Sequence, residues 1–222
     1  MKQIKFSICT ASLFMLMSCV DLNLNPLSEG SSENWYSSQA EIEMSLNDFY
    51  RTDFFPIDDM KWGDDVTARN ETSAVNNGTL TSEDGTIAKR WENYYKGIAR
   101  ALRIINNMDR ARAMGVSEKD IAQYEGEAYF YLGYAYGMLA FHWGDAILDK
   151  VGMGLDEAYT ASRSPKADVL AYSYECLDKA AERLPNSYPG IQRATKGAAY
   201  AFKARIAIYN EDYAAAATAA KN

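Results

Sequence analysis

The stretch YEGEAYFYLGYAYGMLAFHWGD, residues 124–145, determines how the rest of this chain must be arranged. Between Glu127 and Asp145 it contains no formally charged side chain, provided that His142 is neutral. It is too rich in tyrosine and glycine to be a helix that spans lipid, and we interpret it as a buried helix. Because a helix that is apolar on nearly every face must be enclosed by other helices, the segments before and after it are expected to supply amphipathic partners.

A repeat motif lies inside this stretch. Residues 129–136, YFYLGYAY, match the aromatic-x2-Leu-Gly-x2-Tyr pattern of a tetratricopeptide repeat. The glycine of that pattern, here Gly133, lets a partner helix approach closely while the aromatic rings fill the groove. Weaker copies begin at Trp91 and Tyr200, at separations near one and two repeats of about 34 residues. The sequence therefore predicts a mainly all-α fold of tetratricopeptide-like helix pairs, although a tyrosine-rich core helix could show the pattern by chance.

The composition is that of a globular protein. Of the 222 residues, 48% are hydrophobic and 24% are charged. The net charge is −7 at pH 7, and no dense patch of lysine and arginine occurs along the chain. Because such a patch is needed to neutralise the phosphates of nucleic acid, we exclude DNA and RNA as partners.

The first residues have the pattern of a bacterial lipoprotein signal. Two lysines precede an apolar segment, residues 6–17, which is shorter than the roughly 20 residues needed to span a bilayer. Ser18 and Cys19 then follow as in a lipobox. We predict that residues 1–18 are a signal peptide and that Cys19 carries acyl chains such as palmitate, which would hold the protein at a membrane. Ordinary secretion with an incidental cysteine is the alternative.

Two segments follow the predicted signal. Residues 19–32 are polar and include a proline and a glycine, which indicates an extended, lipidated tether. Residues 33–222 are expected to form the helical domain. Once the signal is removed and Cys19 is lipidated, Cys176 is the one cysteine left, so no disulfide within the chain is expected. Its position in a helical pattern favours a buried, inert thiol.

Capping residues and apolar periodicity predict the helices and their ends. Ser31 or Ser32, Ser117, Ser164 and Thr195 are expected to be N-caps. The last helix is rich in alanine and reaches Asn222 without a stop signal, so we expect the sequence to be part of a longer protein. The helices are predicted over about residues 32–50, 86–112, 117–143, 164–184, 195–209 and 213–222.

The long stretch at residues 51–86 shows no helical period and is rich in turn-forming residues. A structureless run of this length is usually functional or disordered, and we expect the ligand site here. An aromatic face and several planar polar groups suit a ligand with many hydroxyls, although a solvated loop with Trp62 in the core is equally compatible with the sequence. The candidate ligand-binding residues are Trp62, Asp64, Asp65, Arg69, Asn70, Asn76 and Asn77.

The side chains that usually carry catalysis are sparse. One histidine and one cysteine in the predicted mature chain do not provide a set of metal ligands. A serine-type triad would have to use His142, whose place on the central helix is more typical of a packed or solvent-tipped side chain. The central glycines follow no strand and precede no Lys-Ser or Lys-Thr, which indicates helix packing rather than a phosphate loop. Adjacent carboxylates do not set a separation across a sugar ring. We therefore predict no metal, no cofactor and no enzymatic activity.

Several short motifs occur in a defined order along the chain. They are the lipobox at Cys19, Trp91-x-x-Tyr94-x-x-x-Ile98, Glu127-Ala128, Trp143-Gly144-Asp145, Arg163-Ser164-x-x-x-Asp168-Val169, Leu184-Pro185, Thr195-Lys196-x-Ala198-Ala199 and Asp212-Tyr213. Each is weak alone, but in this order they resemble the SusD/RagB-type nutrient-binding lipoproteins of Bacteroidetes outer membranes. The resemblance covers nearly the whole chain, which looks like the N-terminal part of such a protein.

The resemblance implies a fold of tetratricopeptide-like pairs with long irregular loops, and a protein that captures its ligand without changing it. Such proteins form the lid of a TonB-dependent, SusC-like transporter and hold an oligosaccharide or a peptide. The implied location is the outer membrane, with a lipid anchor and the domain facing the cell surface, although the residues after Cys19 leave the face open. Two alternatives remain: a lipid-anchored scaffold that binds only proteins, and a helical glycosidase that uses Asp64 or Asp65.

Overall fold

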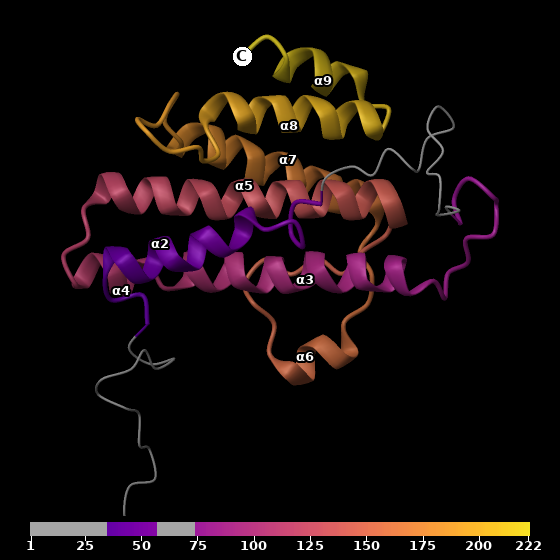
Figure 1. Ribbon diagram of the computed structural model, residues 1–222, viewed down its shortest axis with the longest axis horizontal. Helices are drawn as coiled ribbons and strands as arrows, with labels where there is room; N and C mark the ends of the chain where they lie inside the picture. Colours follow the sequence, from indigo (N-terminus) through magenta and orange to yellow (C-terminus); the bar gives the residue numbers. More distant parts are fainter. Residues whose placement is uncertain (1–34, 57–73) are drawn as a thin grey trace, which may run out of the picture. The chain divides into compact units, whose positions relative to one another are not determined.

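The computed structural model describes residues 35–56 and 74–222. This part of the chain is built from α-helices, with a short 3-10 helix at Asp48–Tyr50 and an isolated antiparallel bridge between Ala146 and Ser164. The prediction of a mainly α-helical chain is confirmed. The α-helices are α2 (Gln39–Asn47), α3 (Gly85–Asn106), α4 (Met108–Ala113), α5 (Glu118–Trp143), α6 (Leu155–Thr160), α7 (Lys166–Arg183), α8 (Lys196–Tyr209) and α9 (Tyr213–Ala219), as Figure 1 shows.

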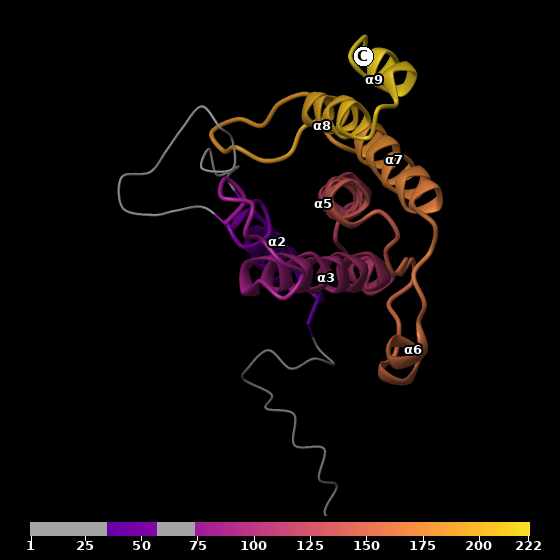
Figure 2. The same cartoon turned by 90° about the vertical axis from the view of Figure 1, so that its right-hand side faces the viewer.

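Helix α5 lies at the centre of this arrangement. All of residues 130–140 are buried, as expected for its apolar sequence. Seen end-on in Figure 2, α5 lies inside a curve formed by α2, α3, α7 and α8. It packs most extensively against α7 and then against α3, while α8 packs against both α7 and α9. The predicted buried helix and its helical neighbours are therefore confirmed.

The glycines of α5 allow its neighbours to approach closely, as the repeat pattern predicts. A Cβ atom on Gly133 would lie 2.5 Å from Leu177 Cγ and 2.9 Å from the carbonyl oxygen of Ser173 in α7. The Ser173 hydroxyl donates a hydrogen bond of 2.6 Å to the carbonyl oxygen of Gly133. A Cβ atom on Gly137 would lie 2.5 Å from Ile206 Cδ1 in α8. On two consecutive turns of α5, the lack of a side chain at glycine thus allows close contact with two different helices, α7 and α8.

Helices α2 to α4 differ from the predicted boundaries. Helix α2 begins at Gln39 rather than near residue 32, because Ser38 and Glu41 form a reciprocal capping box. The expected helix over residues 86–112 is broken at Asn107 into α3 and α4. The Asn107 side-chain amide donates to the Arg103 carbonyl oxygen at 2.7 Å, and this local bond competes with the regular helical pattern.

The C-terminal helices also required corrections. Ser164 does not cap α7, because its backbone pairs with Ala146; the carboxylate of Asp145 accepts instead from the Lys166 backbone N–H at 2.8 Å. No helix was predicted between residues 143 and 164, but this segment contains α6. Helix α9 ends at Ala219 and does not continue to Asn222. The predicted caps at Ser117 and Thr195 are confirmed.

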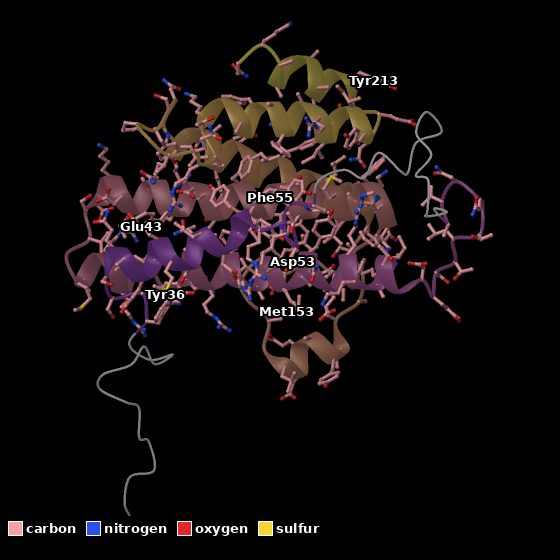
Figure 3. The ribbon with its side chains drawn as sticks, viewed as in Figure 1. Tyr36, Glu43, Asp53, Phe55, Met153 and Tyr213 are labelled. Carbon is pink, nitrogen blue, oxygen red and sulfur yellow. The ribbon has the colours of Figure 1, made fainter. Side chains whose placement is uncertain are left out.

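Helix α6 projects away from the other helices (Figures 1 and 2), and none of its residues is buried. Its base is nevertheless well fixed. The Asp149 carboxylate accepts from the backbone N–H groups of Val151, Gly152 and Met153 at 2.7 to 3.0 Å. The Tyr136 hydroxyl in α5 bonds both the N–H and the carbonyl oxygen of Asp149. Met153, labelled in Figure 3, marks this base.

Candidate ligand-binding site

Two of the seven residues predicted to bind ligand, Asn76 and Asn77, belong to the part of the chain that the structure describes. Trp62, Asp64, Asp65, Arg69 and Asn70 lie outside the described residues, as do the predicted signal peptide, Cys19 and the tether. Asn76 and Asn77 are described and are both exposed, in a turn closed by a 3.1 Å hydrogen bond from the Gly78 N–H to the Val75 carbonyl oxygen. These assignments remain predictions.

A cleft of about 560 Å³ lies where the first turns of α3 meet the end of α5. The loop that carries Asn76 and Asn77 forms one wall, through its apolar and hydroxyl side chains rather than through the two asparagines. Helices α3 and α5 and the segment before α7 form the other walls. The lining residues are Val75, Leu80, Thr81, Ser82, Ile87, Arg90, His142, Trp143 and Arg163.

Two segments that are separated in sequence by α6 meet at this cleft. Gly144 has a φ of +73°, which turns the chain sharply after Trp143 at the end of α5. The next residues are joined to the start of α7 by the two hydrogen bonds between Ala146 and Ser164, of 3.2 and 2.8 Å. Because Arg163 directly precedes Ser164, this bridge brings Arg163 and Trp143 to the same wall of the cleft.

In the described part of the chain, Arg163 contacts an aromatic ring rather than an acid. Its guanidinium carbon lies 5.0 Å from the centroid of the Trp91 ring. The edge of Trp143 packs on Trp91 with ring centroids 5.3 Å apart, and Tyr95 packs on Trp91 at 4.9 Å. The Tyr95 hydroxyl donates to the Ile147 carbonyl oxygen at 2.9 Å, and burial raises its pKa to about 12. The aromatic support beside the cleft is therefore neutral and fixed in place.

A second hollow, of about 410 Å³, adjoins the other side of α3. Arg90 lines both hollows and so lies between them. Pro56 lines this second hollow and Val75 lines the cleft, so both described ends of the predicted binding loop reach this part of the molecule. The lining residues are Thr52, Asp53, Pro56, Gly85, Thr86, Lys89, Arg90 and Asn93.

The comparison with known families agrees with this architecture. A family model described as "Starch-binding associating with outer membrane", the SusD-like family, matches residues 29–208. The chain belongs to the SusD-like family. Two curated relatives from Formosa agariphila are the SusD-like proteins P2 and P38, which are 24% and 26% identical over 94% of this chain. The chain spans only 44% and 42% of their lengths, which is less than half of either protein.

Solved structures show the same SusD-like fold. A SusD-like protein from Bacteroides fragilis superposes with a TM-score of 0.70 at 24% identity, covering 88% of this chain and 39% of its own. A SusD homolog from Bacteroides thetaiotaomicron has a TM-score of 0.72 at 20% identity, covering 87% and 42%. A third structure, determined with a xylogluco-oligosaccharide, has a TM-score of 0.60 at 19% identity, covering 74% and 34%. The resemblance inferred from the sequence motifs is confirmed.

Cys176 and His142, the two reactive side chains singled out in the sequence, lie in different environments in this SusD-like chain. Cys176 is fully buried, and burial raises the pKa of its thiol to about 12, so it is an inert core residue. His142 is exposed at the rim of the cleft. The described residues contain no cluster of histidine, cysteine, aspartate or glutamate that could hold a metal ion. Within residues 35–56 and 74–222, no helix combines the length and the apolar character that crossing a membrane requires.

Sequence reasoning missed four residues that line the cleft: Arg90, His142, Trp143 and Arg163. Trp143 and Arg163 belong to the SusD-like motifs of the sequence, but those motifs do not mark a ligand site, and the sequence pattern around Arg90 predicts only a helix. The sequence signal that could have found them is an aromatic residue, Trp143, before the turn at Gly144, and a cationic residue, Arg163, just before α7. Their proximity could not be predicted, because it depends on the bridge between Ala146 and Ser164.

Proposed function

We propose that this chain captures an oligosaccharide at the bacterial outer membrane and does not alter it chemically. The observation that carries the proposal is the cleft beside Trp143, in a chain whose family is described as starch-binding and associated with the outer membrane. An indole offers an apolar face for a sugar ring, while serine, threonine and arginine side chains bond hydroxyl groups. A few polar groups that converge on a concave surface are typical of a binding site.

The predicted loop residues would complete this site. Both described ends of the loop at residues 51–86 reach the hollows on either side of Arg90. Trp62, Asp64, Asp65, Arg69 and Asn70 belong to the same loop, and we propose that they contact the ligand together with Trp143. A peptide ligand is the alternative, since arginine and aromatic side chains also bind peptides.

Binding would be measured by calorimetry of the full chain against a panel of plant and algal oligosaccharides, with the same mixtures analysed for cleavage products. Ser82→Trp should weaken binding by about tenfold or more, because a bulky side chain on an exposed loop would fill the cleft without removing a core contact. Tyr213→Ala, on the far helix α9, is the matched control, since this exposed aromatic residue (Figure 3) does not line the cleft. Release of shorter sugars would instead support the glycosidase alternative.

We further propose that Cys19 is lipidated and that the protein acts as the lid of a TonB-dependent, SusC-like transporter. The lipobox pattern and the family description support this location. In a Bacteroidetes host, Cys19→Ser should move the protein from the membrane fraction to the soluble fraction. Extraction in mild detergent should recover the protein with its natural Cys19 together with the transporter. Recovery of a soluble product with a free Cys19 thiol from the unmodified gene would contradict the proposal.

The protein-binding scaffold remains a second candidate because of α6. Leu155 and Tyr159 of this helix are 72% and 82% exposed, and Val151, in the segment before it, is 70% exposed. Exposed apolar residues on a projecting element are compatible with a protein contact. If this were the main function, changing Leu155 and Tyr159 to serine would abolish recovery of a partner, while Ser82→Trp would have no effect on any measured property.

A further inference from the structure

We propose that the cleft between α3 and α5 selects acidic sugars, and that Arg163 binds their carboxylate or sulfate group. This inference rests on the proposed oligosaccharide binding and names the class of ligand. It is carried by the position of Arg163, the charge of the cleft lining and the rigidity of the segment that holds both.

Arg163 has no acidic partner among the residues that the structure describes. It is exposed, it lies over the Trp91 ring, and no described carboxylate comes within 4.0 Å of its nitrogens. Other arginines of the helical domain do have acidic partners: Arg112 pairs with Glu118 and Glu125, and Arg183 also pairs with Glu125. A guanidinium that lies on an aromatic ring keeps the N–H groups at its edge available for two parallel bonds to a carboxylate or sulfate.

The described residues that line the cleft are basic, whereas the protein as a whole is acidic. The chain carries a net charge of −7. Among the described residues that line the cleft, however, Arg90 and Arg163 are cationic, His142 is titratable, and none is acidic. A concave surface of one charge concentrates ligands of the other charge. A cleft that bound only neutral sugars would gain no affinity from a basic lining in an acidic protein.

Nearby acids already have partners on the backbone. The Asp84 carboxylate accepts from the Thr86 N–H at 2.8 Å at the start of α3. The Asp145 carboxylate accepts from the Lys166 N–H at 2.8 Å at the start of α7. Each carboxylate therefore caps a helix, where the helix dipole stabilises its negative charge. Neither residue lines the cleft.

The segment that carries Arg163 is held before any ligand binds. The bridge between Ala146 and Ser164 and the cap from Asp145 fix the backbone on both sides of it. Contact with Trp91 restricts the side chain itself. Because little conformational freedom remains to be lost, an ionic bond to a ligand gives more net affinity here than on a mobile surface arginine. Trp143, on the same wall, would lie against the sugar ring that bears the acid.

The test compares ligands that differ only in charge. Calorimetry of the full chain would use tetragalacturonic acid and its fully methyl-esterified form, and a sulfated galactan oligosaccharide with its desulfated counterpart. We expect each acidic probe, or one of the two, to bind at least about tenfold more tightly than its neutral counterpart. Preference within one pair alone identifies the acid as a carboxylate or as a sulfate.

Variants assign the effect to Arg163. Arg163→Gln should reduce binding of the preferred acidic probe about tenfold and weaken the neutral counterpart much less, because glutamine can still bond a hydroxyl group, while Arg163→Lys should keep part of the preference. Arg103→Gln removes an exposed arginine of α3 outside the cleft and should change neither affinity. Circular dichroism would show that each variant is folded.

The outcomes separate the two proposals. If acidic and neutral probes bind with equal affinity, or if Arg163→Gln weakens both alike, the selection of acidic sugars is overturned while oligosaccharide capture stands. If no member of the panel binds, both proposals fail. An affinity difference that persists in Arg163→Gln would overturn the role of Arg163.

Discussion

At the scale of single residues, burial decides which groups are available for chemistry. Cys176 lies in α7 with no exposed surface, and Tyr136 is buried in α5. Burial raises the pKa of the Cys176 thiol to about 12, because the charged form loses its hydration. His142 and Arg163, in contrast, are exposed at the cleft. Of these four side chains, the two that water and ligands reach lie beside the C-terminal end of α5.

Cys176 should be unreactive as long as the chain is folded. In a variant with Cys9 and Cys19 changed to serine, Cys176 is the one thiol. With a raised pKa of about 12, it is almost entirely protonated at pH 8, and the reactive thiolate is scarce as well as inaccessible. We expect no reaction with a chromogenic disulfide reagent at pH 8 and a stoichiometric reaction in denaturant. Rapid reaction of the folded protein would contradict the described burial.

At the scale of elements, close packing between helices and hydrogen bonds in the turns stabilise the fold. Helix α5 meets α7 at Gly133 and α8 at Gly137, where there is no space for a side chain. The excursion that contains α6 has no core of its own, and it depends instead on the hydrogen bonds around Asp149. The first arrangement depends on packing and the second on hydrogen bonds, so they should respond differently to substitution.

Gly133→Ala should lower the free energy of unfolding by about 1–3 kcal/mol, because the added methyl group would overlap Leu177 and the backbone of Ser173. Urea unfolding followed by circular dichroism would measure this. Gly85→Ala is the matched control: its Cβ atom would meet nothing within 4 Å, and we expect a change within about 0.5 kcal/mol. Equal effects at the two positions would show that α5 and α7 are farther apart than described.

Asp149→Ala should loosen the α6 excursion without unfolding the helices around α5. Three backbone N–H groups lose their acceptor, at Val151, Gly152 and Met153. We expect cleavage between residues 146 and 164 by a nonspecific protease to become faster, while the melting temperature stays nearly constant. Asp156→Ala removes another acid from the same excursion and should leave the cleavage rate unchanged, since its carboxylate makes no described hydrogen bond.

At the scale of the whole molecule, a network of hydrogen bonds and an ion pair around the buried Glu127 joins distant parts of the chain. The Glu127 carboxylate accepts from the Tyr50 hydroxyl at 2.7 Å and from Arg193 Nη1 at 2.9 Å. Tyr50 belongs to the segment after α2, Glu127 to α5 and Arg193 to the connection before α8. The Tyr50 hydroxyl also accepts from the Ala194 N–H at 2.9 Å. Burial, followed by the charge of Glu127, raises the pKa of Tyr50, which therefore remains a neutral donor.

Arg193→Ala should destabilise the fold by about 3 kcal/mol, because Glu127, whose side chain is 1% exposed, would be left without its counterion. The same urea experiment would detect this loss. Lys179→Ala breaks an exposed pair with Glu175 on α7 and should cost no more than about 0.5 kcal/mol. Restoration of stability by the double variant Arg193→Met with Glu127→Met would separate the cost of an unpaired charge from the loss of packing.

Much of the architecture follows from local patterns. The apolar run at residues 124–145 had to be buried, and the glycine in its repeat pattern had to allow a close neighbour. The caps at Ser117 and Thr195 were predictable because one side chain bonds a backbone group three residues away. The cap of α7 was not, because Asp145 reaches it from the other side of α6. Likewise, the break at Asn107 reflects one side-chain bond within a pattern that otherwise continues.

The sequence by itself therefore determined the helical class, the central helix and the SusD-like family, since each depends on the order and spacing of residues along the chain. Tertiary structure alone decided which residues line the cleft. Trp143 and Arg163 come together through a turn at Gly144 and a bridge between Ala146 and Ser164. A contact of this kind depends on the path of the intervening chain, and no periodicity in the sequence encodes that path.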